Sequence, residues 1–415
     1  MRGSGHWHPE GLGHADVKFL VPLKTCRMLI HPPVRPTSWR LLLALAGLLS
    51  VWPGMTAADD QAVENLLVRP AEGFQTPRGY VCYRTAGAMD VDGRLDEAAW
   101  KSAAWTDEFV DIEGAVKPQP TWKTRVKMLW DDEYLYIGVE LEEPHVWGTL
   151  TRHDAVIFQD NDFEVFVDPD GDGHNYGELE LNVLNTTWDL RLPKPYKDGG
   201  MADDAWEIEG LKTATSCDGT VNDPSDLDRA WTVELAIPLR SLSKLKAKVS
   251  EQGQIPRDGE QWRINFSRVE WDVEIQGQEY RKIPGRPEHN WVWSPQYTVN
   301  MHRPETWGYI EFRNARGSVR NARETLVRKD PFGPVRYQLT RIYYAQQAHR
   351  QEHAAYATEL TQLELTRLED ESLVGPIEMK STADGWQAVA KVRLSDGQET
   401  ECRIDHSSRF TIGPD

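Results

Sequence analysis

Residues 130–141 of the chain read WDDEYLYIGVEL. After a turn made by two aspartates, apolar residues occupy every second position, so that Leu135, Ile137 and Val139 would share one face of an extended strand. A helix would instead need apolar residues three or four positions apart. This stretch therefore predicts a β-strand with one buried face.

The same alternation recurs in short runs that Asp, Gly and Pro turns separate. These runs are 125–129 (RVKML), 163–168 (FEVFVD), 178–184 (ELELNVL), 230–238 (AWTVELAIP), 262–269 (WRINFSRV) and 307–312 (WGYIEF). Several short strands with turn signals between them are typical of an antiparallel β-sandwich or jelly roll. The predicted fold is therefore mainly β, an antiparallel β-sandwich followed by a C-terminal α-helix and a small β-hairpin region.

Tryptophan is concentrated in this part of the chain, where 13 of the 17 tryptophans lie between residues 80 and 312. The indole N–H keeps a polar partner, so tryptophan favours half-buried positions at rims and clefts. Flat rings on a rigid β-scaffold suit sugar recognition. The formal charge of −18 weighs against nucleic-acid or anionic-membrane partners, whereas a neutral polysaccharide is not repelled.

The N-terminal part carries a secretory pattern. Residues 41–52 (LLLALAGLLSVW) form an apolar run that follows Arg35 and Arg40 and precedes small residues. The run is short for a membrane span, so we expect a signal peptide over residues 1–58, with Met28 as an alternative start. The chain would then be exported to the periplasm or the extracellular space. An uncleaved N-terminal anchor is the alternative.

The rest of the chain divides by pattern into four segments: a polar lead-in at 59–79, the sandwich at 80–313, a linker at 314–334, and a helix plus small sheet at 335–415. Residues 337–368 carry apolar side chains at helical spacing without internal Gly or Pro. This predicts an amphipathic helix, broken once near Tyr356. Such a helix would dock on the sandwich or mediate self-association.

Four cysteines, Cys26, Cys82, Cys217 and Cys402, occur singly and far apart. Without C-x-x-C spacing, they support neither a zinc site nor a haem-attachment motif. We expect buried free thiols, with a Cys82–Cys217 disulfide as the alternative.

Five segments, in order, resemble the family 9 carbohydrate-binding modules and their relatives among the DOMON-like sandwiches. They are 91–100 (VDGRLDEAAW), 130–136 (WDDEYLY), 160–168 (DNDFEVFVD), 231–238 (WTVELAIP) and 262–268 (WRINFSR). Each motif alone is weak, but five in register over about 230 residues agree with one fold. The resemblance covers residues 80–312 and does not reach the tail.

The resemblance implies that a sugar is held between aromatic faces at one edge of the sandwich. Phe158 stands where family members present a stacking Trp, and Asn182 stands where they carry a hydroxyl-binding Arg. The stretch 299–304 lacks the family's second stacking ring, which is a departure. We therefore expect aromatic and guanidinium groups nearby to complete the site: Arg268, Trp271, Trp291 and Trp293. Trp291 and Trp293 would share one strand face if this segment is extended.

A possible metal site lies in the turn after the third motif. Asp168, Asp170 and Asp172 place three carboxylates at alternate positions before a glycine, a pattern that resembles a calcium loop. Position 12 of the loop is Leu179, so the EF-hand ligand pattern fails. Structural calcium at the three aspartates is one interpretation, and a solvated hairpin turn is the other.

The predicted function is that of an exported carbohydrate-binding protein that recognises a polysaccharide or oligosaccharide and supports carbohydrate catabolism, alone or with a partner enzyme. No G-x-S-x-G, H-E-x-x-H or Cys/His signature indicates an enzyme. Two alternatives stay open. A glycoside hydrolase could use sandwich carboxylates such as Glu164, Glu178 and Glu180. A haem-binding, electron-transferring DOMON-like domain could use Met301 and His302.

Overall fold

The structure is a computed structural model that describes residues 76–85, 87–248, 254–314, 327–365, 368, 370–382 and 385–413. The predicted signal peptide at 1–58, Cys26, most of the lead-in and much of the linker lie outside these residues. None of the helices in the described ranges is long and apolar enough to cross a membrane.

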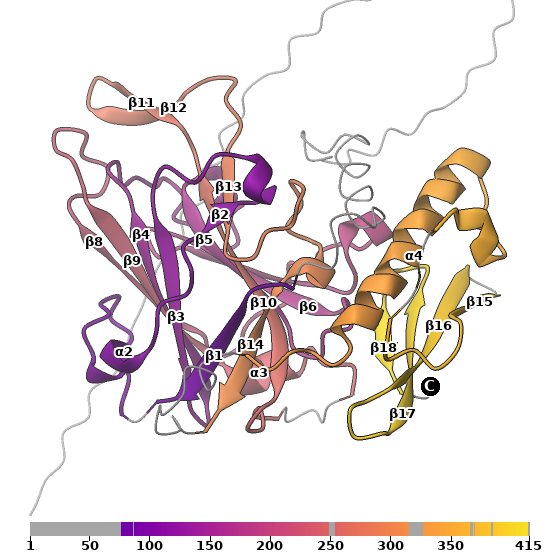
Figure 1. Ribbon diagram of the computed structural model, residues 1–415. Helices are drawn as coiled ribbons and strands as arrows, with labels where there is room; N and C mark the ends of the chain where they lie inside the picture. Colours follow the sequence, from indigo (N-terminus) through magenta and orange to yellow (C-terminus); the bar gives the residue numbers. More distant parts are fainter. Residues whose placement is uncertain are drawn as a thin grey trace, which may run out of the picture. The chain divides into compact units, whose positions relative to one another are not determined.

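A single curled sheet makes up most of the described chain (Figure 1). It contains twelve of the described strands. They are β1 (Gly79–Arg84), β2 (Val110–Asp111), β3 (Thr124–Trp130), β4 (Tyr134–Glu142), β5 (Asp162–Asp168), β6 (Tyr176–Asn182), β7 (Thr187–Leu192), β8 (Lys212–Asp218), β9 (Ala230–Pro238), β10 (Gln261–Glu270), β13 (His289–Val292) and β14 (Gly308–Arg313).

The strand order is β7-β6-β5-β10-β14-β1-β3-β4-β9-β8, with β13 and β2 attached beside β10. Strand β1 joins two halves of the sheet, because it pairs with β14 on one side and with β3 on the other, parallel in both cases. The other pairings of this sheet are antiparallel. The mainly β sandwich prediction is confirmed, with the parallel closure at β1 as an addition.

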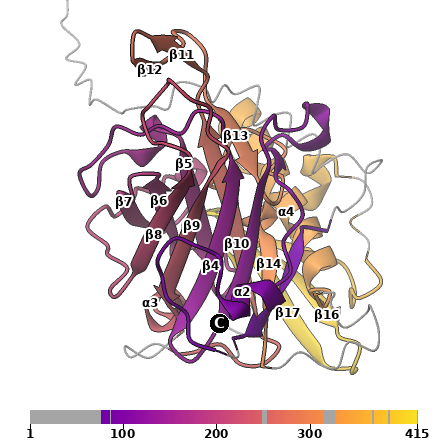
Figure 2. The same ribbon diagram turned by 90° about the vertical axis from the view of Figure 1, so that its left-hand side faces the viewer.

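The main core fills the space between the two halves. Leu135, Ile137 and Val139 of β4 are fully buried in it, as the alternation in residues 130–141 predicted. Phe163 of β5 and Phe266 of β10 stack in the same core from the other half. Figure 2 shows β4, β8 and β9 as neighbours along one half of the sheet. One face of each half is therefore apolar, and the other is free for polar side chains.

The first family-like motif is fixed to the outer face of β9 by a buried carboxylate. Glu234 accepts hydrogen bonds from the indole of Trp100 at 2.8 Å and from the backbone N–H groups of Asp92 and Gly93 at 3.0 and 3.2 Å. Trp100 belongs to the short helix α2 (Ala98–Ser102). Gly93 has φ +87°, and a Cβ there would lie 2.6 Å from the backbone of Thr215, which explains the glycine.

The C-terminal part has its own small core. Helix α4 (Gly333–His353) packs on an antiparallel sheet of β15 (Glu378–Ser381), β16 (Trp386–Arg393), β17 (Glu399–Asp405) and β18 (Phe410–Ile412). The helical stretch expected over 337–368 begins earlier, at Gly333, and the break predicted near Tyr356 falls at Ala354, which takes a left-handed conformation with φ 57° and ends α4. A 3-10 turn, η6 (Leu360–Leu363), follows.

Polar contacts dock this tail on the sandwich. The side chain of Arg409 donates to Asp172 Oδ2 at 2.9 Å, and the Phe410 N–H donates to the Asp172 carbonyl at 2.9 Å. From helix α4, the Tyr343 hydroxyl donates to Asp198 Oδ1 at 2.6 Å. The tail thus rests on the loop after β5 and on the turn after β7.

We predict that Tyr343→Phe loosens this docking. The substitution removes a buried hydrogen bond to a carboxylate, so the free energy of unfolding should fall by about 1.5–3 kcal/mol. Hydrogen exchange should also become faster in α4. Denaturant unfolding and amide exchange measure both effects. Tyr356→Phe is the control, because the Tyr356 hydroxyl accepts a hydrogen bond from Arg350 within the tail and none is found from the described sandwich residues. Equal losses in the two variants would contradict a docking role.

A second prediction concerns pH. Burial raises the pKa of Glu234 from 4.5 to about 7. A raised carboxyl pKa contributes stability that is complete below pH 4.5 and is lost as the pH rises through 7. Wild-type protein should therefore lose more unfolding free energy, by up to a few kcal/mol, between these values than Glu234→Gln does. Thermal unfolding across this range, with Glu142→Gln at an exposed position as the control, tests the expectation; parallel curves for all three proteins would refute it.

Candidate functional site

Acidic side chains line the outer face of the neighbouring strands β5 and β6. On β5, Phe163 and Val165 lie in the main core, so Asp162 and Glu164 occupy the opposite face. Strand β6 repeats the pattern, with leucines in the core and polar residues outside: Glu178, Glu180 and Asn182. The alternation that builds the core thus also places a group of buried acids on the opposite face.

The strand register brings three of these acids together. Glu164 pairs with Glu180, and one carboxylate oxygen from each of them and from Asp162 lies within 4.8 Å of the others. All three residues are buried. Burial raises the pKa of Glu164 to about 7, and burial and the neighbouring carboxylates raise the pKa values of Asp162 and Glu180 well above the ordinary range. The protein alone therefore disfavours full ionisation of this cluster.

An aromatic rim borders the acids, and two predicted site residues form it. The Phe158 N–H donates to Glu180 Oε2 at 3.0 Å, and the Trp271 indole donates to the Phe158 carbonyl at 2.9 Å. Both side chains are half-buried. Lys282 places its Nζ 3.5 Å from the centroid of the Trp271 ring. We call Phe158 and Trp271 the aromatic rim.

Asn182 lies next to this region but is fully buried. Its side-chain amide donates to the Leu150 carbonyl at 2.8 Å and to Asp160 Oδ2 at 2.9 Å. These bonds hold the loop before β5, which also carries Phe158. The structure therefore gives Asn182 a positioning contact in place of the hydroxyl contact that the resemblance implied.

The other three predicted residues lie on the core side of the sheet. Arg268 is fully buried and donates to Glu143 at 2.7 Å and to Glu270 at 2.8 Å. Trp291 and Trp293 share a strand face as expected, but they are only 4% and 1% exposed in the main core. Since their faces are covered by protein, the structure does not offer them as a stacking platform.

The three aspartates expected to bind calcium do lie together, within 4.8 Å of one another. Their oxygens already have partners in the protein: Asp168 accepts the N–H groups of Gly171 and Gly173, and Asp172 accepts Arg409. The arginine beside Asp172 favours the interpretation of a hairpin turn that docks the tail over that of a calcium site. Calcium at this loop stays a prediction.

The residues named for a haem alternative are packed in a secondary core. His302 is buried, its Nδ1 lies 3.0 Å from the Tyr176 hydroxyl, and its ring meets Phe166 and Tyr196 at their edges. Burial lowers the pKa of His302 to about 3, so the imidazole stays neutral. Cys82, Cys217 and Cys402 are free thiols, as expected, although only Cys82 and Cys402 are buried and Cys217 is half-buried.

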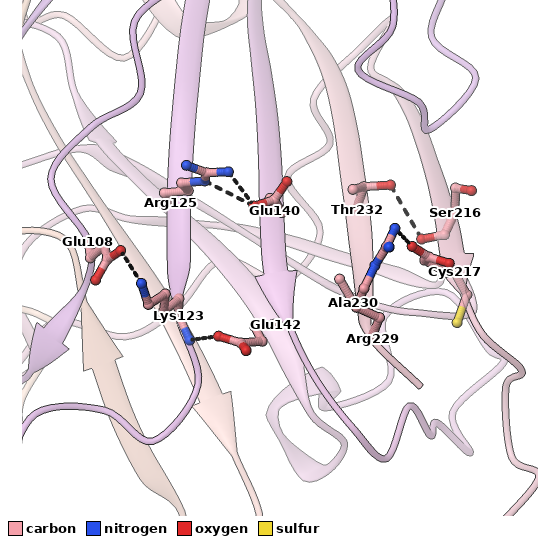
Figure 3. A pocket seen from close by; sticks show the side chains of 11 residues that line it. Glu108, Lys123, Arg125, Glu140, Glu142, Ser216, Cys217, Arg229, Ala230 and Thr232 are labelled. Carbon is pink, nitrogen blue, oxygen red and sulfur yellow. Dashed lines mark hydrogen bonds and ion pairs between the residues drawn. The ribbon is translucent and has the colours of Figure 1, made fainter. Parts of the chain in front are cut away.

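A separate groove of about 540 Å³ lies on the opposite half of the sheet (Figure 3). Ion pairs line it: Arg125 with Glu140 at 2.7 Å, and Lys123 with Glu108 at 3.1 Å. No aromatic side chain is among the described residues that line the groove. It can donate and accept hydrogen bonds, but it offers no ring for stacking.

Sequence reasoning named Glu164 and Glu180 only as possible catalytic carboxylates of a glycoside hydrolase, and it did not name Asp162 as a site residue. The signal was available, because DFEVF and ELELN both place acids at every second position of adjacent strands. What the sequence did not provide was the register that sets Glu164 opposite Glu180.

Comparisons with known proteins agree with the motifs. Residues 91–257 match the family model described as carbohydrate family 9 binding domain-like. A segment of 118 residues is 29% identical to endo-1,4-beta-xylanase C of Paenibacillus barcinonensis. That match covers 28% of this chain and spans only 10% of the xylanase.

Two solved structures are also similar. One is described as a putative carbohydrate-binding protein from Bacteroides uniformis, with 15% identity, a TM-score of 0.43, and coverage of 57% of this chain and 100% of that one. The other is a family 9 carbohydrate-binding module from Caldicellulosiruptor kristjanssonii in complex with cellotriose, with 17% identity, a TM-score of 0.36, and coverage of 60% and 100%. Residues 91–257 match the model of the carbohydrate family 9 binding domain-like family, so the resemblance predicted from the sequence is confirmed.

Proposed function

We propose that this protein binds a polysaccharide or oligosaccharide at the aromatic rim, on the outer face of β5 and β6. The observation that carries the proposal is the joint position of Phe158 and Trp271 beside Glu164 and Glu180. A pyranose has an apolar C–H face that stacks on an aromatic ring and hydroxyl groups that donate to carboxylates. The half-buried rim offers the stacking faces, and Glu164 and Glu180, which are 5% and 3% exposed, lie directly beside it.

The surroundings of Trp271 indicate how a sugar would approach. The ammonium of Lys282 occupies one side of the indole, so a sugar ring would stack on the side that faces away from Lys282. The indole N–H is held by the Phe158 carbonyl, which fixes the orientation of the ring before any ligand arrives. Such preorganisation lowers the entropy cost of binding.

The groove of Figure 3 supports sugar binding less well. Its arginine and lysine side chains are already paired with carboxylates, so a sugar hydroxyl would have to compete with an ion pair. The lack of an aromatic side chain among its described lining residues removes the stacking contribution. We therefore assign the glycan to the rim and use the groove as a source of controls.

We further infer export and a role in polysaccharide breakdown. The apolar run at 41–52 supports export, and the similarity to a segment of a xylanase supports a role beside polysaccharide-degrading enzymes. N-terminal sequencing of the secreted protein should find a start near Ala58. Recovery of the intact N-terminus in the membrane fraction would favour an uncleaved anchor.

We predict that Trp271→Ala and Phe158→Ala each weaken glycan binding by about 1–3 kcal/mol, because each removes a stacking face. A glycan array on the wild-type protein would identify the ligand, and calorimetry would then compare the variants. Reducing-sugar release from the same ligand would separate a binder from an enzyme.

The matched control is Trp105→Ala. Trp105 is also half-buried, but it lies on the groove side under Arg125. The Trp105→Ala substitution should leave the affinity for the glycan unchanged. A loss of affinity in Trp105→Ala with none in the rim variants would move the glycan to the groove and overturn the assignment.

A further inference from the structure

Two histidines lie one helical turn apart at the end of α4. His349 and His353 are four positions apart, so they occupy the same face of the helix. Their rings stack nearly parallel, with an interplanar angle of 20° and centroids 4.2 Å apart. The side chain of His353 is 53% exposed, and His349 is half-buried. Two imidazoles that meet at an accessible surface can act as a pair of metal ligands.

The hydrogen bonds of the two rings decide which nitrogen is available. His349 Nδ1 lies 2.9 Å from the Ala355 carbonyl oxygen, and His353 Nδ1 lies 3.0 Å from the His349 carbonyl oxygen. Because a carbonyl oxygen only accepts, each Nδ1 carries a proton and donates it. In a neutral imidazole the other nitrogen, Nε2, then holds the free lone pair.

Neither Nε2 has a hydrogen-bond or ion-pair partner within the part of the chain that the structure describes. Histidines that bind metals usually donate their other ring N–H to a backbone carbonyl or a carboxylate, which fixes the tautomer and the orientation of the ring. The last turn of α4 therefore already supplies the outer hydrogen bonds of a metal site.

The end of the helix also favours a cation. Helix α4 ends at His353, because Ala354 is left-handed. The last carbonyl groups of a helix carry partial negative charge, which stabilises positive charge beside them. Glu352 adds a carboxylate oxygen 4.0 Å from His353 Nδ1. Arg350, the basic residue between the two histidines, donates to the Tyr356 hydroxyl at 2.7 Å.

We propose that His349 and His353 bind a divalent transition-metal ion through their Nε2 atoms, with copper(II) held most tightly. Imidazole nitrogen suits copper, nickel and zinc, and among these divalent ions affinity is highest for copper. A metal–nitrogen bond is about 2 Å long, so two nitrogens on one ion are about 3 Å apart. Rotation of the exposed His353 ring can provide that separation, and waters would fill the other positions. Calcium prefers oxygen ligands and should not bind this pair.

Calorimetric titration of the full chain with copper(II) chloride, without any glycan, tests the proposal. We expect the affinity for one equivalent of copper to fall by at least about 10-fold in His349→Gln and in His353→Gln, since loss of an outer-shell partner alone costs that much. The electron paramagnetic resonance signal that these variants lose should be that of copper with two imidazole nitrogens. His153→Gln is the matched control, because His153 is another exposed histidine, 3.3 Å from Glu207. This control should bind copper as the wild type does.

Three results would each overturn the proposal. They are equal copper binding by the wild type and both α4 variants, loss of the site in His153→Gln alone, and a lost signal that lacks imidazole nitrogen. Should a variant not fold, the wild-type resonance spectrum decides, because an absence of copper bound by two imidazoles contradicts the pair. Since glycan is absent throughout, the outcome is independent of the function proposed for the rim.

Discussion

The two-residue period of the strands is the constraint on which the rest of the structure depends. Each strand of the curled sheet gives one row of side chains to the core and the other row to the outside. The core takes the apolar row, so the composition of the other row is free to vary. On β4 that row contains Glu140, which pairs with Arg125, whereas on β5 and β6 it is acidic without such partners. Core packing thus decides which row faces outward but not which side chains that row carries.

This constraint also explains what could be predicted from the sequence. In residues 130–141, apolar side chains at every second position predicted the face of β4 that lies in the core. Trp291 and Trp293 were correctly placed on one face, but two tryptophans in a short segment do not say whether that face lies in the core or outside. Burial of a given row depends on which strand lies opposite. Phe158 and Trp271 lie just outside the strands, Phe158 in a 3-10 turn before β5 and Trp271 directly after β10, and both are half-buried.

The acids and the C-terminal tail likewise show that the sequence does not predict contacts between residues far apart in the chain. DFEVF and ELELN indicate two acidic faces, yet only the pairing of Glu164 with Glu180 turns them into one cluster. The aspartates of the turn after β5 look like ion ligands in isolation, but Arg409, more than 230 residues later, reaches Asp172. A local motif does not reveal a partner so distant in sequence. Composition identified the charged groups correctly, and tertiary contacts decided their roles.

The two acidic clusters then differ in a way that follows from their partners. Around Asp172, an arginine and backbone N–H groups bind the polar atoms of the cluster, so the cluster holds the tail on the sandwich. Around Asp162, the neighbours are carboxylates and a rim of aromatic rings. A protein that buries charge without pairing it loses stability, and sequences that do so place the cost at functional sites more often than elsewhere. A ligand would therefore stabilise the protein more at the cluster around Asp162 than at the aspartates of the turn after β5.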